Sequence, residues 1–113
     1  RDPTMRNCQT IEEAVHLAYD HVDSMSPRGL SAFWATVSKL LQSQYRGSGK
    51  RQKNKIDHRR MHHQIDRILA RTMENIAAFG YRDMAQTAIS LAKIVKSVES
   101  RGGIKRILRD ILV

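Results

Sequence analysis

The stretch SPRGLSAFWATVSKLL, at residues 26–41, decides the fold because a second version of it stands later in the chain. Shifting the sequence by 54 residues places it on residues 80–95, GYRDMAQTAISLAKIV. Apolar positions fall on apolar positions, and the agreement continues upstream through residues 11–25 and their counterparts. An internal repeat of this kind predicts a repetitive architecture.

Each copy contains two helix-length apolar stripes. Thr10 and Glu13 have the spacing of a capping box, which predicts a helix over residues 11–25. Pro27 cannot continue that helix but suits the first position of another, so a second helix is predicted over residues 27–41. Two helices joined by so short a turn fold back as a helical hairpin.

The second copy predicts helices over residues 64–79 and 82–98, with a start from Lys55 or Asp57 as the alternative for the first of them. Gly80 lies between them, and we expect it to end the first. The buried stripe of that helix is expected to include Met73. The inward face of the helix over residues 82–98 is expected to be apolar throughout: Met84, Ala88, Leu91, Ile94, Val95 and Val98.

A third copy begins after a Gly-Gly break. Residues 104–108, IKRIL, repeat the spacing of residues 65–69, IDRIL, at an offset of 39 rather than 54. A basic insertion in the first copy accounts for the difference, so the period is about 38–40 residues, the scale of two-helix solenoid repeats. We therefore expect an all-α fold of antiparallel helical hairpins, stacked as an α-solenoid fragment of about two and a half repeats. Its single domain divides into repeat one at 10–41, the basic insertion at 43–63, repeat two at 64–98 and the start of a third repeat at 103–113.

The charge is high and unevenly spread. The chain has a formal net charge of +9, and residues 46–63 alone hold 7 basic and 1 acidic side chains, a balance of +6. Such a surface favours a polyanionic partner, first a nucleic acid, then an acidic membrane or an acidic protein. No apolar run approaches the ~18–20 residues that span a bilayer. One cysteine, Cys8, allows no intramolecular disulfide and favours a reducing compartment.

The two phrases MSPRGLSAFWATVSKLL and FGYRDMAQTAISLAKIV, residues 25–41 and 79–95, resemble the repeats of octotricopeptide-repeat proteins and of the related FAST-kinase-like and RAP-domain proteins. Those repeats read as a turn, a polar residue, Leu, small residues, Trp-Ala and Ala-Lys-Leu. The second copy departs from this pattern at Ala88, where Trp is expected, and no RAP module is present. The matching residues are Pro27, Leu30, Trp34, Ala35, Lys39 and Leu40 in the first copy, and Asp83, Met84, Ala85, Leu91, Ala92, Lys93 and Ile94 in the second.

The resemblance covers most of residues 11–113, apart from the basic insertion. It implies an organellar RNA-binding α-solenoid, located in a mitochondrion or plastid, that acts in RNA processing, RNA stability or translation. Because the chain begins at Arg1 rather than Met, we expect it to be a piece of a longer protein without its targeting segment.

Two groups of residues are candidate RNA contacts. At 100° per residue, Arg28 and Lys39 lie opposite the apolar stripe of their helix. They recur in the second copy as Arg82 and Lys93. Cations there would neutralise phosphates, and Gln86 would reach a base edge. The second group lies in the basic insertion: Lys50, Arg51, Lys53, Lys55, Arg59 and Arg60. Both groups can equally be solvated surface, and the stripe can also serve packing between repeats.

Aromatic and histidine residues offer weaker candidates. Trp34 falls in an apolar stripe and is expected in the core, whereas Tyr45 and Tyr81 near repeat ends are candidates for base stacking. His58 and His62 have the i, i+4 spacing of metal ligands on a helix, but no third ligand is evident, so surface histidines are the expectation.

The sequence contains no Gly-rich phosphate loop, no nucleophile motif and no isolated carboxylate pair, so no enzyme, cofactor, metal or small-molecule substrate is expected. The alternative to an RNA-binding module is a scaffold that binds other protein subunits or lies in a ribonucleoprotein particle such as an organellar ribosome.

Overall fold

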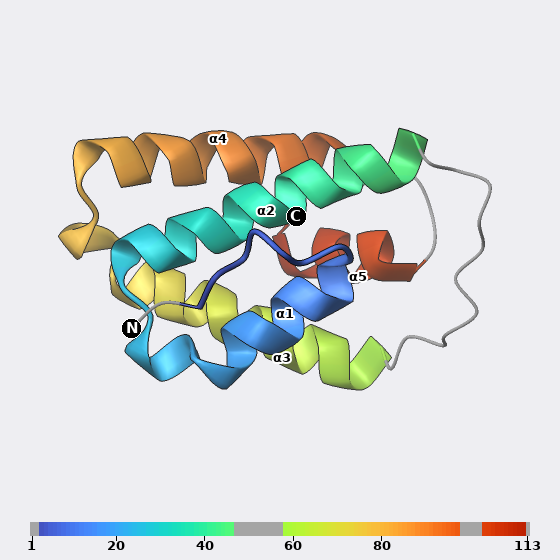
Figure 1. Cartoon of the computed structure of the whole chain (residues 1–113), viewed down its shortest axis with the longest axis horizontal. Coiled ribbons are helices and arrows are strands. Elements are labelled where there is room, and N and C mark those ends of the chain that lie inside the picture. Colours follow the sequence, from blue (N-terminus) through green and yellow to red (C-terminus); the bar gives the residue numbers. More distant parts are fainter. Residues whose placement is uncertain (1–2, 47–57, 98–102, 113) are drawn as a thin grey trace.

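The computed structural model describes residues 3–46, 58–97 and 103–112, and every regular element within them is helical (Figure 1). The prediction of an all-α chain is confirmed for these residues. In chain order the elements are α1 (Ile11–Asp20), the 3-10 helix η1 (Val22–Ser24), α2 (Pro27–Arg46), α3 (His58–Glu74), the 3-10 helix η2 (Ile76–Ala78), α4 (Tyr81–Ser97) and α5 (Gly103–Leu112).

The helices form two layers (Figure 1). In the first layer α3 packs between α1 and α5, and in the second layer α2 packs along α4, the most extensive helix pair of the described chain. Within each layer the helices run in the same direction, and the two layers run antiparallel to each other. The hairpin α1–α2 is thus followed by α3 and α4, which lie in the same two layers.

Helix α2 supplies the centre of the core. Leu30, Phe33, Trp34 and Val37 are fully buried, and the rings of Phe33 and Trp34 meet edge to face at a centroid distance of 4.8 Å. The indole Nε1–H of Trp34 donates to Thr72 Oγ1 of α3 at 2.9 Å. A buried indole N–H requires such a partner, so this bond links the two layers as well as satisfying the donor. The predicted core position of Trp34 is confirmed.

The turn between the two helices recurs with the same backbone geometry at a spacing of 54 residues. His21, after α1, has φ −117° and ψ 10°, and Asn75, after α3, has φ −107° and ψ 9°. A 3-10 turn follows each. Met25 and Phe79 then adopt the same extended conformation, at −72°, 137° and −71°, 133°. The repeat seen in the sequence is therefore also a repeat of local structure.

The predicted ends of the first and third helices are wrong. Helix α1 ends at Asp20 rather than at residue 25, and the 3-10 helix η1 follows it. Helix α3 ends at Glu74 rather than at Phe79, and the Asn75 side-chain amide donates to the Arg71 carbonyl at 2.8 Å, pairing one of the last-turn acceptors. Gly80 belongs instead to the start of α4, where its carbonyl accepts from Met84 N at 2.8 Å.

The helices on either side of the basic segment are longer than their apolar stripes indicated. Helix α2 continues to Arg46, and α3 begins at His58, so both extend into the predicted insertion at 43–63. Met61, only 3% exposed, extends the buried stripe of α3 backwards from Ile65.

The predicted inward face of α4 is largely wrong. Ile94 is buried and Leu91 is half-buried, but Met84, Ala88 and Val95 are exposed; Val98 lies outside the described residues. Two small polar residues take their place in the interior, Thr87 and Ser90. Met73 of α3 is likewise 56% exposed, contrary to expectation.

The reason lies in the neighbouring helix. Helix α2 presents buried Ser31 and Ser38, and Ser31 Oγ donates to the Asp83 carbonyl of α4 at 3.3 Å. Small side chains on both helices allow a close approach, so α4 turns its small polar strip toward α2 rather than its most apolar one.

We expect the Thr72→Val substitution to destabilise the fold by about 1–3 kcal/mol, because it leaves the buried Trp34 N–H without an acceptor. Urea unfolding followed by the fluorescence of Trp34, the one tryptophan of the chain, measures this directly. Thr87→Val is the matched control, since Thr87 is equally buried and its Oγ1 has no hydrogen-bond partner among the described residues. Equal losses for both substitutions would contradict the importance of the bond.

The chain before α1 contains the capping box and the single cysteine. The capping box is confirmed: Thr10 Oγ1 accepts from Glu13 N at 3.1 Å, and Glu13 Oε1 accepts from Thr10 N at 3.1 Å. Close by, burial raises the pKa of the Cys8 thiol above its ordinary value, and the negative charge of Glu13 acts in the same direction.

We expect iodoacetamide to alkylate Cys8 more slowly in the folded protein than after unfolding at pH near 8, because the raised pKa lowers the thiolate fraction. A raised folded-state pKa stabilises the fold at neutral pH, and this contribution is lost as pH rises through that pKa. Glu13→Gln keeps the capping acceptor, removes the charge and should speed alkylation. Identical rates for the variant and the parent would show that the charge has no effect.

Candidate nucleic-acid interface

The first half of the predicted cationic stripe lies on α2. Arg28 and Lys39 are both exposed, and neither has a hydrogen bond or ion pair with another described residue. They are 11 residues apart, which places them about 20° apart around the helix and about 16 Å apart along it. The buried residues Leu30 and Val37 lie on the opposite side of α2. The stripe therefore faces away from the core.

The second half lies on α4, beside α2. Arg82, Gln86 and Lys93 are exposed and have no polar partner among the described residues. They share one face of α4, turned by about 100° from the buried strip that contains Thr87 and Ser90. Because α2 and α4 are neighbours that run in the same direction, the structure brings the two halves of the stripe onto one helix pair (Figure 1).

The second group of candidates is only partly described. Lys50, Arg51, Lys53 and Lys55 lie outside the described residues. Arg59 and Arg60 are exposed on the first turn of α3. Since α3 belongs to the first layer, these two arginines are on a different layer from the stripe.

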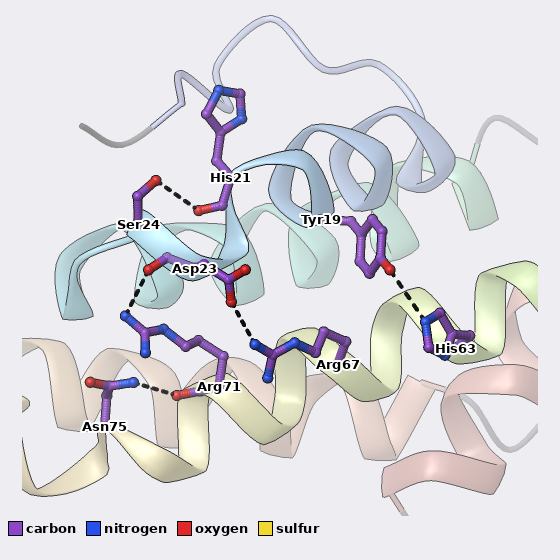
Figure 2. A network of polar contacts seen from close by, with 8 residues as sticks. All are labelled: Tyr19, His21, Asp23, Ser24, His63, Arg67, Arg71 and Asn75. Atoms are coloured by element: carbon purple, nitrogen blue, oxygen red, sulfur yellow. Dashed lines mark hydrogen bonds and ion pairs between the residues drawn. The ribbon is translucent and has the colours of Figure 1, made fainter.

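A further set of basic residues on α3 is occupied in holding the helices together (Figure 2). Arg67 Nη2 pairs with Asp23 Oδ1 of η1 at 2.5 Å, and Arg71 Nη2 donates to the Asp23 carbonyl at 3.2 Å. One turn before Arg67, His63 Nε2 lies 3.2 Å from the Tyr19 hydroxyl of α1. These contacts connect the first hairpin to α3.

Nothing in the sequence pattern indicates this network. Asp23 and Arg67 are 44 residues apart, and nothing in the pattern of either segment pairs them. The network changes how the net charge is interpreted, because Arg67 and Arg71 already have acceptors within the protein. The cations of the stripe do not.

Other kinds of site find little support in the part of the chain that the structure describes. No group of three or more His, Cys, Asp or Glu side chains there could hold a metal ion. None of the described helices is both long and apolar enough to cross a bilayer. Tyr81, the stacking candidate that begins α4, is 98% exposed beside Arg82; the side chain of Tyr45 lies outside the described set.

Comparison with protein-family models, with curated proteins and with solved structures gives no match.

We expect Asp23→Asn to destabilise the protein by only about 0.2–1 kcal/mol, because the paired side chains of Asp23 and Arg67 are 80% and 37% exposed. Thermal unfolding at low salt and at about 1 M salt measures the effect, which should shrink as the charges are screened. Asp20→Asn, at an exposed carboxylate near the end of α1, is the matched control. A salt-independent loss at Asp23 would mean that the ion pair is not its source.

Proposed function

We propose that this chain is an RNA-binding helical-repeat module, without catalytic activity of its own, from a larger factor of RNA processing, RNA stability or translation. The observation that carries the proposal is the exposure of Arg28, Lys39, Arg82 and Lys93 on two adjacent parallel helices, without polar partners in the described chain. The side-chain type recurs at the same repeat position on both helices. A core does not require that recurrence, whereas a regularly spaced row of phosphates would favour it.

The geometry of the stripe suits a single strand. Cations about 16 Å apart on each helix offer separate phosphate contacts, and phosphate contacts supply affinity without reading sequence. Gln86 adds a donor and an acceptor for a base edge, and the exposed ring of Tyr81 offers a stacking surface. Arg59 and Arg60, with the basic segment before them, would add affinity from the first layer.

The proposal includes the architecture. We infer that the two layers are a section of an α-solenoid, because parallel helices repeat within each layer and the turn geometry repeats at 54 residues. The resemblance to organellar RNA-binding repeats adds a mitochondrial or plastid location to the proposal.

Charge reversal tests the stripe. Arg28→Glu with Arg82→Glu should weaken binding of a mixed-sequence single-stranded RNA by roughly 10-fold or more, and should reduce the slope of log affinity against log salt by about 1.4, since each lost contact contributes about 0.7. Fluorescence anisotropy over a salt series measures both quantities.

The matched control reverses two exposed arginines away from the stripe, Arg6→Glu with Arg109→Glu, which changes the net charge equally. Both double variants should keep the parental stability, because exposed substitutions change it by about 0.5 kcal/mol or less. If the two double variants weaken binding equally, only overall charge matters and the stripe is not the interface.

The alternative is a protein-binding scaffold or a structural subunit of a ribonucleoprotein particle such as an organellar ribosome. The observation that favours it is the exposed apolar surface of α4, with Ile89 56% and Met84 39% exposed. Met84 separates the two functions, because it lies on the opposite side of α4 from Arg82 and Lys93, whereas Ile89 lies within about 40° of both. A chain that binds no RNA but co-purifies with protein subunits through Met84 would favour the scaffold.

A further inference from the structure

Helix α4 has an unpartnered apolar edge. We define the α4 edge as the six residues that lie on the side of the helix away from α2: Met84, Ala85, Ala88, Ile89, Ala92 and Val95. All six are exposed, and the three large ones are 39%, 56% and 36% exposed in the order Met84, Ile89, Val95. Together with Met73 and Tyr81, these three are the large apolar side chains that the described chain leaves exposed.

The same six positions in the first copy are covered. A shift of 54 residues maps the α4 edge onto Leu30, Ser31, Trp34, Ala35, Ser38 and Leu41 of α2. Five of these are buried, with exposed fractions of 0%, 1%, 0%, 6% and 1%, and Ala35 is half-buried. The next repeat covers them: α4 packs along this side of α2, and Thr72 of α3 pairs with Trp34. The α4 edge is therefore the repeat of an interface that the structure already shows.

The first layer already extends beyond the second repeat. Helix α5 packs on α3 and contacts α4, and Ile107 and Leu108 in α5 correspond to Ile68 and Leu69 of α3 at an offset of 39. Helix α5 is thus placed as the first helix of a third hairpin. A second helix of that hairpin would lie against the α4 edge as α4 lies against α2.

We propose that the α4 edge is the docking surface for a further second-layer helix, the partner of α5 in a third hairpin. Its chemistry follows from the existing interface. The docking helix runs parallel to α4 and presents small polar residues and one aliphatic residue, as α4 itself presents Thr87, Ser90 and Ile94 to α2.

Helix α2 of a second copy does not offer such a face. The α2 residues equivalent to Thr87, Ser90 and Ile94 are Phe33, Thr36 and Leu40. Phe33 is fully buried and the other two are half-buried, so this helix has no free strip of this kind to place against α4.

Fusing an additional copy of residues 75–97 directly after Val113 tests the proposal. By the offset of 39, position 113 corresponds to Glu74, the last residue of α3, so the added segment follows α5 as η2 and α4 follow α3. The fused chain should unfold at a temperature about 5 °C or more above the parent, because the docked helix buries the exposed apolar side chains. Amides of α4 should also exchange more slowly.

Ile89→Glu separates docking from a general effect of the added segment. It should remove most of the stabilisation in the fused chain and change the parent little, because Ile89 is already exposed there. Met73→Glu is the matched control, since Met73 on α3 has the same exposed fraction of 56% and lies outside the α4 edge. It should leave the gain intact.

Two outcomes would overturn the proposal. One is a fused chain with no gain in stability, or with a gain that Ile89→Glu leaves unchanged. The other is a parent chain that dimerises in sedimentation experiments and becomes monomeric with Ile89→Glu, which would assign the edge to a second copy. Neither measurement involves RNA, so the result is independent of the proposed function.

Discussion

The hydrogen bond from the Trp34 indole to Thr72 Oγ1 is the contact on which the arrangement of the two layers depends. Trp34 is the largest fully buried side chain of the described protein, and its N–H would be costly to bury without an acceptor. The acceptor comes from α3, in the next repeat, and not from its own hairpin. Thr72 in turn donates to the Ile68 carbonyl at 2.8 Å, so the pair fixes both the rotation of α2 and its height along α3. Packing alone tolerates small sliding, whereas a buried polar pair accepts one register.

The same structure divides the positive charge into two classes. Arg67 pairs with the Asp23 carboxylate through one Nη2, and Arg71 donates to the Asp23 carbonyl through another, so both connect the first hairpin to the second repeat. The four cations of the stripe on α2 and α4 have no hydrogen bond or ion pair with another described residue. Net charge by itself would count all of them toward a polyanion interface. The internal contacts hold Arg67 and Arg71 against η1, and the exposed cations without a polar partner in the described chain form a smaller set with a regular arrangement.

The two repeats are more alike in backbone conformation than in which side chains they bury. The turns after α1 and α3 agree within about 10° in their backbone angles, yet Leu30 is buried and its counterpart Met84 is not. The difference arises because burial depends on the neighbour that follows, and α2 is followed by α4. Ala88, the counterpart of Trp34 in the second copy, is exposed. A tryptophan there would have no equivalent of Thr72 to accept a hydrogen bond from its indole N–H.

The sequence by itself determined the existence of the helices, the capping box at Thr10, the core position of Trp34 and the set of residues that share each helix face, but not where the first and third helices end. These follow from local chemistry and from the 3.6-residue period. Only the tertiary structure decided which face each helix buries. Thr87 and Ser90 face inward in place of Met84 and Val95 because α2 offers small serines and a close approach, and neither helix shows that in its own pattern. Polar pairs formed across more than 40 residues were equally invisible, because periodicity describes one helix at a time while burial and pairing belong to two.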